Sequence, residues 1–219
     1  MKRLRLVCLS IVAVALLGAT LASSASAYLA FTTSRGLLPT PARLFKFWEW
    51  LIFAFSTASG SGSVSCSGAT MTGVLETNAA KKDDAVIEET AFGGEGLGSD
   101  CESSLGPATI TGSQEPWPNE FTEKKQWTIK GTKKVAFTVT FLALEGVSCT
   151  YEASKVKSTF NAGAAGHPEP VTVNTSDQVF KAAKKSNAAC PKTGELSGSI
   201  KAVANGETLE AEIVGKTKK

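Results

Sequence analysis

Apolar and polar residues alternate along much of the chain, and this alternation constrains the fold more than any other feature. The clearest case is residues 135–141, where every second position holds Val or Phe and the positions between hold Ala or Thr. Neighbouring side chains of a β-strand point to opposite faces, so the pattern predicts a half-buried strand. The same alternation in residues 147–153 predicts a second strand, with Cys149 on its inward face.

Turn residues separate the alternating segments. Asn205 and Gly206 tolerate the positive φ angles of a type I′ turn, so they predict a hairpin between residues 200–204 and 209–213. We expect about ten short strands and no clear amphipathic helix. The sequence therefore predicts an all-β fold of mostly antiparallel strands, a β-sandwich that is Ig-like or related, with a barrel-like closure as the alternative.

The first 27 residues have the pattern of an export signal. Residues 1–5 are cationic, residues 6–22 are apolar, and Ala25-Ser26-Ala27 supplies the small side chains that a signal peptidase requires. We predict cleavage between Ala27 and Tyr28, which would release a secreted or envelope-associated chain. The alternative is an uncleaved membrane anchor, because the apolar run approaches the length of a transmembrane helix.

The charges exclude one class of partner. The chain has 23 Lys and Arg residues against 20 Asp and Glu residues, a formal net charge of +3. Lys2, Arg3 and Arg5 lie in the signal, so the remaining charges balance. A nucleic-acid-binding protein needs a basic footprint, and the sequence predicts none. The paired lysines at 124–125 and 184–185, and those at 133–134, are interpreted as solubilising charges.

The cysteines predict two disulfides. Cys8 lies in the signal, which leaves Cys66, Cys101, Cys149 and Cys190. An even number in an exported chain indicates disulfides, for which three pairings exist. We favour Cys66 with Cys101 and Cys149 with Cys190, because each pair brackets one run of strands. No Cys-x-x-Cys occurs and His167 is the only histidine, so we predict no metal site and no cofactor.

Residues 28–63 differ in composition from residues 64–219, which we expect to form the secreted β-sandwich domain. Residues 44–55 are strongly apolar and aromatic, and residues 56–63 are rich in Gly and Ser. Twelve residues are too few to span a bilayer as a helix. Residues 44–55 are therefore interpreted as a core strand, with a packed helix or a membrane-surface segment as alternatives.

No set of residues points to catalysis. His167 lies in a loop-like segment, and no Gly-x-Ser-x-Gly motif accompanies it. The Gly-rich run at 93–98 lacks the Gly-Lys-Ser/Thr ending of a phosphate-binding loop. We therefore predict no catalytic residue and a protein that is not an enzyme.

Two tryptophans are candidate binding residues. Pro116 and Pro118 flank Trp117, which would hold that ring on a stiff loop where it could stack on a sugar, and Trp127 is a second candidate. Burial in the core is the favoured alternative for both, because each ring removes a large apolar area from water.

Several short motifs resemble those of a group of exported, uncharacterised actinobacterial proteins. They are Cys66, the segment 100–111 (Asp-Cys-Glu-Ser-Ser-Leu-Gly-Pro-Ala-Thr-Ile-Thr), Pro116-Trp117, Cys149-Thr150-Tyr151 and Cys190-Pro191. The resemblance covers about residues 53–214 and implies a secreted, β-rich domain with four cysteines. It implies no activity, and residues 44–55 depart from it.

These observations favour a non-enzymatic module of the cell envelope or extracellular space, with a structural or binding role. The alternative is a glycan-binding module or a hydrolase whose carboxylates are dispersed in the sequence. The partner is not identified by the residues; a cell-wall or extracellular glycan or a protein is expected. A cleft lined by two carboxylates or by exposed tryptophan would favour the alternative.

Overall fold

A computed structural model describes residues 27–57, 60–66, 69–92, 101–144 and 147–215. Residues 1–26 of the predicted signal and the Gly-rich run at 93–98 lie outside these residues. The described secondary structure consists of β-strands. No described helix is long and apolar enough to cross a membrane.

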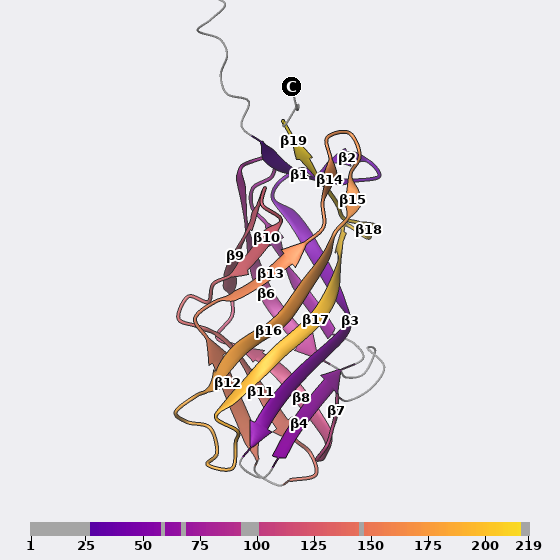
Figure 1. Ribbon diagram of the computed structural model, residues 1–219. Helices are drawn as coiled ribbons and strands as arrows, with labels where there is room; N and C mark the ends of the chain where they lie inside the picture. The colour runs from indigo at the N-terminus through magenta and orange to yellow at the C-terminus, as the bar shows by residue number, and fades with distance from the viewer. Residues whose placement is uncertain (1–26, 58–59, 67–68, 93–100, 145–146, 216–219) are drawn as a thin grey trace, which may run out of the picture.

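The described strands fill eight positions around a closed antiparallel barrel (Figure 1). Single long strands fill three positions: β3 (Ala42–Thr57), β16 (Thr172–Ala182) and β17 (Thr193–Ala204). Two consecutive strands fill each of the others: β4 (Gly60–Cys66) with β5 (Ala69–Leu75), β6 (Lys82–Phe92) with β7 (Cys101–Ser103), β8 (Gly106–Ser113) with β9 (Trp117–Thr122), β10 (Gln126–Ile129) with β11 (Val135–Phe141), and β12 (Ser148–Ala153) with β13 (Val156–Phe160). The predicted all-β, antiparallel class is confirmed, and the sheet closes as a barrel.

Strand β3 closes the barrel. It pairs with β17 from Leu44 opposite Ala204 to Phe55 opposite Gly194. Its other edge pairs with β4 and β5. Residues 44–55 are therefore a strand of the barrel wall, as the core-strand interpretation expects, and form neither a helix nor a separate surface segment. Residues 42–57 and 60–63 therefore belong to the same barrel sheet as the strands that follow them.

A second, smaller sheet covers one end of the barrel, at the top of Figure 1. It contains β1 (Tyr28–Thr33), β2 (Gly36–Leu37), β14 (Gly163–Ala164), β15 (Glu169–Pro170) and β19 (Glu210–Val214), while β18 (Glu207–Thr208) pairs with β17. The ring of Phe31 enters the barrel end and lies 5.1 Å from that of Phe121 and 6.4 Å from that of Phe160. These contacts bury aromatic area and fix the cap on the barrel.

Asn78 ties the cap to the turn between β5 and β6. Its Nδ2 donates to the carbonyl oxygens of Phe31 (2.9 Å) and Leu38 (2.8 Å), and its Oδ1 accepts from the amide of Phe31 (2.8 Å). One side chain thus bonds three main-chain groups of the cap, alongside the main-chain bond from the Leu38 amide to the Phe31 carbonyl (2.9 Å).

Alternating side chains fill the barrel interior. In β11 the predicted inward positions are all buried, and Ala136 is buried as well. Trp127 stacks on Phe121 with ring centroids 5.6 Å apart, and its Nε1 donates to the buried Oδ1 of Asn119 at 2.7 Å. The polar atom of a large ring is therefore satisfied inside the core.

The structure contains two disulfides, as predicted, and their pairing is the one that the sequence analysis favoured. Cys66–Cys101 joins β4 to β7, with Cα atoms 4.3 Å apart, and Cys149–Cys190 joins β12 to the segment before β17, with Cα atoms 5.6 Å apart. Disulfides of this kind are typical of proteins from oxidising compartments.

Candidate functional site

The barrel wall is split between the β12–β13 position and β16. Backbone pairing joins Glu152 to Lys181 at one end and Thr159 to Asn174 at the other. Between these points, no backbone pairing connects residues 153–158 with residues 175–180, all of which the structure describes. We call these two facing strand edges the seam.

Local irregularities in β16 open the seam. The pairing of β16 with β17 shifts between Thr175 and Gln178, and Asp177 has a φ of 49°. The amide of Asp177 donates to Ser197 Oγ at 3.0 Å and not to the β12–β13 side. A bulge of this kind bends its strand and interrupts the ladder on the other edge.

Side chains bridge the seam in place of the missing backbone bonds. On the inner side, the buried hydroxyls of Ser158 and Thr175 lie 2.7 Å apart. On the outer side, the amide of Lys157 donates to Gln178 Oε1 at 2.8 Å. The seam is therefore polar through the thickness of the wall.

Two adjoining grooves lie beside the lower part of the seam. The first has a volume of about 610 Å³, and the second about 450 Å³. The first is lined by Gln114, Glu115, Thr132, Lys133, Lys134 and Glu152; the second by Lys134, Glu152, Ala153, Ser154, Lys155, Val179, Lys181, Ala182, Ala183 and Lys184. They share Lys134 and Glu152, so together they carry five lysines and two glutamates.

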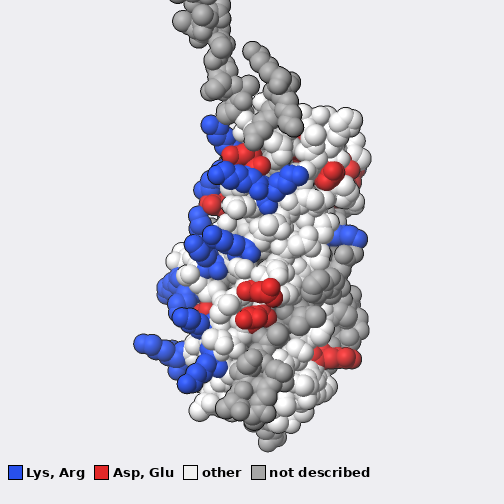
Figure 2. All heavy atoms as spheres, in the orientation of Figure 1, with Lys and Arg blue, Asp and Glu red and all other residues white. Residues whose placement is uncertain are grey.

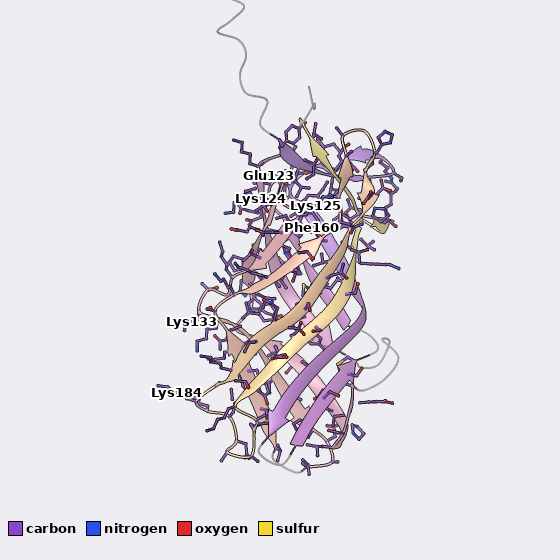
Figure 3. The ribbon with its side chains drawn as sticks, viewed as in Figure 1. Glu123, Lys124, Lys125, Lys133, Phe160 and Lys184 are labelled. Carbon is purple, nitrogen blue, oxygen red and sulfur yellow. A yellow bond between two sulfur atoms is a disulfide. The ribbon has the colours of Figure 1, made fainter. Side chains whose placement is uncertain are left out.

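The figures show the same concentration of lysine. In Figure 2, Lys and Arg side chains gather along the left edge of the molecule. In Figure 3, Lys133 and Lys184 project from this edge into solvent. We call the two grooves and their lysines the basic grooves.

Positive charge dominates the basic grooves. Glu152 is neutralised by an ion pair with Lys134 and also accepts from Gln114 Nε2 at 3.4 Å. In the described part of the chain, no carboxylate lies within ion-pair distance of the other four lysines, Lys133, Lys155, Lys181 and Lys184. Four ammonium groups are therefore available to an anion.

Glu115 also lines the first groove and is bonded to the barrel wall. Thr90 Oγ1 donates to its Oε1 at 2.5 Å. Burial raises the pKa of Glu115 above its usual value, because a carboxylate loses hydration inside the protein.

A third, smaller depression of about 200 Å³ lies at the other end of the seam. Its lining consists of amide and hydroxyl side chains and one lysine: Gln126, Thr128, Lys157, Ser158, Thr159, Asn174 and Ser176. Among the residues that the structure describes, no carboxylate lines it. We call it the polar depression.

The Cys149–Cys190 disulfide positions the segment that carries Lys184. Ser186 Oγ donates to the carbonyl of Thr150 at 2.7 Å and accepts from the Thr150 amide at 3.0 Å. Ala183 also donates its amide to Thr150 O at 2.8 Å. The disulfide and these bonds hold residues 183–190 against β12, beside the second basic groove.

The structure places the sequence-based candidates elsewhere. Trp117 is 3% exposed and Trp127 is 1% exposed, so neither ring is presented to a sugar outside the barrel. Trp117 is the first residue of β9 and not part of a loop, and its Nε1 donates to Ser113 O at 3.2 Å. The alternation of Trp117, Asn119 and Phe121 in β9 turns Trp117 inward, and Trp127 is buried on β10. Both rings therefore lie in the core, which is the alternative that the sequence analysis favoured.

His167 lies in the cap, in the exposed turn between β14 and β15. Its amide donates to Ala164 O at 2.9 Å, which closes that turn. Within the described ranges, no three or more His, Cys, Asp or Glu side chains gather in an arrangement that could hold a metal ion.

No pattern in the sequence indicates the basic grooves as a unit. Lys133 and Lys134 precede β11, Lys155 links β12 to β13, and the remaining two lysines lie on and after β16. The doubled lysines at 133–134 and 184–185 were a signal, but their meeting depends on the order of strands in the barrel.

The fold and these surfaces define a disulfide-bonded, antiparallel β-barrel with a capped end and lysine-lined grooves on its wall. No family model matches the chain, and no curated protein matches it. Among solved structures it is similar to DynF from the dynemicin biosynthesis pathway of Micromonospora chersina. The TM-score is 0.50 at 12% sequence identity, covering 82% of this chain and 85% of that chain. At this identity the similarity shows the fold alone.

Proposed function

We propose that the protein is an exported, non-enzymatic binding module of the cell envelope or extracellular space, and that its basic grooves bind an anionic polymer. The observation that carries the proposal is the set of four lysines without carboxylate partners along two adjoining grooves. Grooves lined by charge of one sign attract ligands of the opposite sign.

Export is supported by two independent features. The cationic, apolar and small-residue segments of residues 1–27 follow the order of a secretory signal. The two disulfides suit an oxidising compartment. Envelopes and extracellular matrices present polymers that carry carboxylate or phosphate groups, which are ligands for lysine.

Neutralising two groove lysines is expected to weaken polymer binding. In the variant Lys155→Gln/Lys181→Gln, affinity for polygalacturonate should fall about tenfold, because each exposed charge contact is worth up to about 1 kcal/mol. The measurement is isothermal titration calorimetry at low ionic strength, where screening is weakest.

The matched control is Lys81→Gln/Lys201→Gln, which changes the net charge equally but lies outside the basic grooves. It should bind as the unaltered protein does. Equal weakening by both variants would show that binding depends on net charge alone and would contradict a site in the grooves. Uncharged dextran should not bind.

One observation favours a hydrolase as a second candidate. The first groove contains two carboxyl groups in different environments, since Glu115 has a raised pKa and Glu152 is paired with Lys134. Glycosidases use such a pair as acid and base. Both carboxyl groups are already bonded to protein partners here, Glu115 to Thr90 and Glu152 to Lys134 and Gln114.

We therefore expect no cleavage of bound polymer. Incubating the protein with polygalacturonate should release no new reducing ends above those of a buffer control. Release that Glu115→Gln abolishes would instead establish the hydrolase.

A further inference from the structure

We propose that the polar depression binds uncharged sugar hydroxyls, so that the ligand of the seam is an acidic polysaccharide and not a polyphosphate or a nucleic acid. This inference rests on the proposed function and specifies its ligand. The basic grooves would hold the anionic groups of the polymer, and the polar depression would hold the hydroxyl groups of adjacent sugar units.

The lining of the polar depression matches sugar chemistry. Amides and hydroxyls both donate and accept hydrogen bonds, as sugar hydroxyls do. Gln126 and Asn174 supply exposed amides from β10 and β16, and Thr128 supplies a hydroxyl from β10. Ser176 Oγ on β16 donates to Asp177 Oδ2 at 2.8 Å and so offers an acceptor to a ligand. A site for phosphates alone would need only donors, so the acceptor oxygens of these side chains favour a ligand with O–H groups.

The interrupted ladder adds main-chain groups to the same surface. Residues 153–158 and 175–180 make no backbone pairs across the seam. The described cross-seam bonds come from side chains, between Ser158 and Thr175 and between Gln178 and the Lys157 amide. Strand edges that face each other without pairing offer further donors and acceptors to a polar ligand.

The polar depression and the second basic groove flank one seam and can hold a single polymer. Asn174 lines the former and Lys181 the latter, both on β16. The seven residue steps from Asn174 to Lys181 span up to about 23 Å, somewhat less because of the bulge at Asp177. This is longer than a monosaccharide and requires an oligosaccharide. Within the second basic groove, Val179 is 54% exposed and offers an apolar surface to the C–H face of a sugar ring.

The test compares two probes of similar charge, one with sugars and one without. These are a galacturonate oligosaccharide and inorganic polyphosphate, titrated against the full mature chain and against Gln126→Ala/Asn174→Ala. The double variant should bind the oligosaccharide at least fivefold more weakly and polyphosphate unchanged. Thr111→Ala, an exposed hydroxyl loss on β8, should change neither affinity. Circular dichroism and urea unfolding establish that each variant is folded.

The outcomes separate this inference from the proposed function. If the double variant binds both probes as the unaltered protein does, or loses both equally, the sugar-binding role of the polar depression is overturned while the basic grooves stand. If the unaltered protein binds polyphosphate or single-stranded DNA more tightly than the oligosaccharide, the ligand class is overturned. If it binds no polyanion, the proposed function itself fails.

Discussion

Replacing Cys149 and Cys190 with alanine is expected to lower the free energy of unfolding by roughly 4 kcal/mol and to weaken binding at the basic grooves. The disulfide closes a loop with a sequence separation of 41, and the chain-entropy model assigns about 4 kcal/mol to a loop of that length. Urea unfolding of the oxidised protein and of the variant measures the difference.

The loss of binding has a separate cause. Residues 183–190 carry Lys184 and are held against β12 by the disulfide together with Ser186. Without the covalent link this segment is free to open, and the ammonium group of Lys184 must then be ordered when ligand binds. Ordering a loop on binding subtracts from affinity. We expect a severalfold loss for polygalacturonate at temperatures well below unfolding.

The chain offers a matched control in its other disulfide. Cys66–Cys101 has a sequence separation of 35, so its removal should cost a similar free energy of unfolding. It joins β4 to β7 and lines neither basic groove. The variant Cys66→Ala/Cys101→Ala should therefore lose stability but keep its affinity. Equal affinity losses in the two variants would contradict a specific role for the Lys184 segment.

Local sequence signals located strands well but could not determine how they close. The alternation in residues 135–141 and 147–153 corresponds to β11 and β12, which pair with each other. The Asn205-Gly206 turn is present, with φ angles of 51° and 81° at the two residues. Closure depends on pairing between β3 and β17, which are about 150 residues apart, and no local pattern contains that information.

The tryptophans and the lysines illustrate the same limit. A Trp between two prolines resembles a stiff loop locally, yet Trp117 begins β9 and faces inward because its neighbours continue the strand alternation. Lys133, Lys155 and Lys181 are each ordinary surface residues in sequence. Only the adjacency of β11, β12–β13 and β16 gathers them, so the candidate site is a property of topology.

One buried carboxyl group is expected to make the stability of the barrel depend on pH. Asp83 lies on β6 near the capped end and is 0% exposed. Its Oδ1 accepts from the Ala80 amide at 3.1 Å, whereas its Oδ2 is buried and has no hydrogen-bond partner among the described residues. Burial raises the pKa of Asp83 to about 7, the neighbouring Asp84 adds to the rise, and the bond from Ala80 opposes it.

The sign of the effect follows from proton binding. An unfolded Asp has a pKa of about 4, so between about pH 4 and pH 7 the folded chain holds the proton that the unfolded chain has lost. The free energy of unfolding therefore decreases as the pH rises through this window. Each pKa unit corresponds to about 1.4 kcal/mol, which sets an upper guide of about 4 kcal/mol for the total decrease.

Asp83→Asn should remove this decrease. Asparagine keeps an oxygen that accepts from Ala80 and carries no charge, so the variant should be more stable than the unaltered protein at pH 8 by up to about 4 kcal/mol. Any cost of the buried NH₂ group applies equally at every pH. It therefore lowers the free energy of unfolding of the variant by a constant amount and does not change how that free energy depends on pH. Urea unfolding from pH 4 to pH 8 measures the free energy of unfolding as a function of pH.

The control is Asp84→Asn, because Asp84 lies beside Asp83 but is partly exposed and paired with Lys82. In this variant the free energy of unfolding should decrease with pH as it does in the unaltered protein. A slope that survives in Asp83→Asn would show that other groups govern the pH dependence and that Asp83 is ionised in the folded barrel.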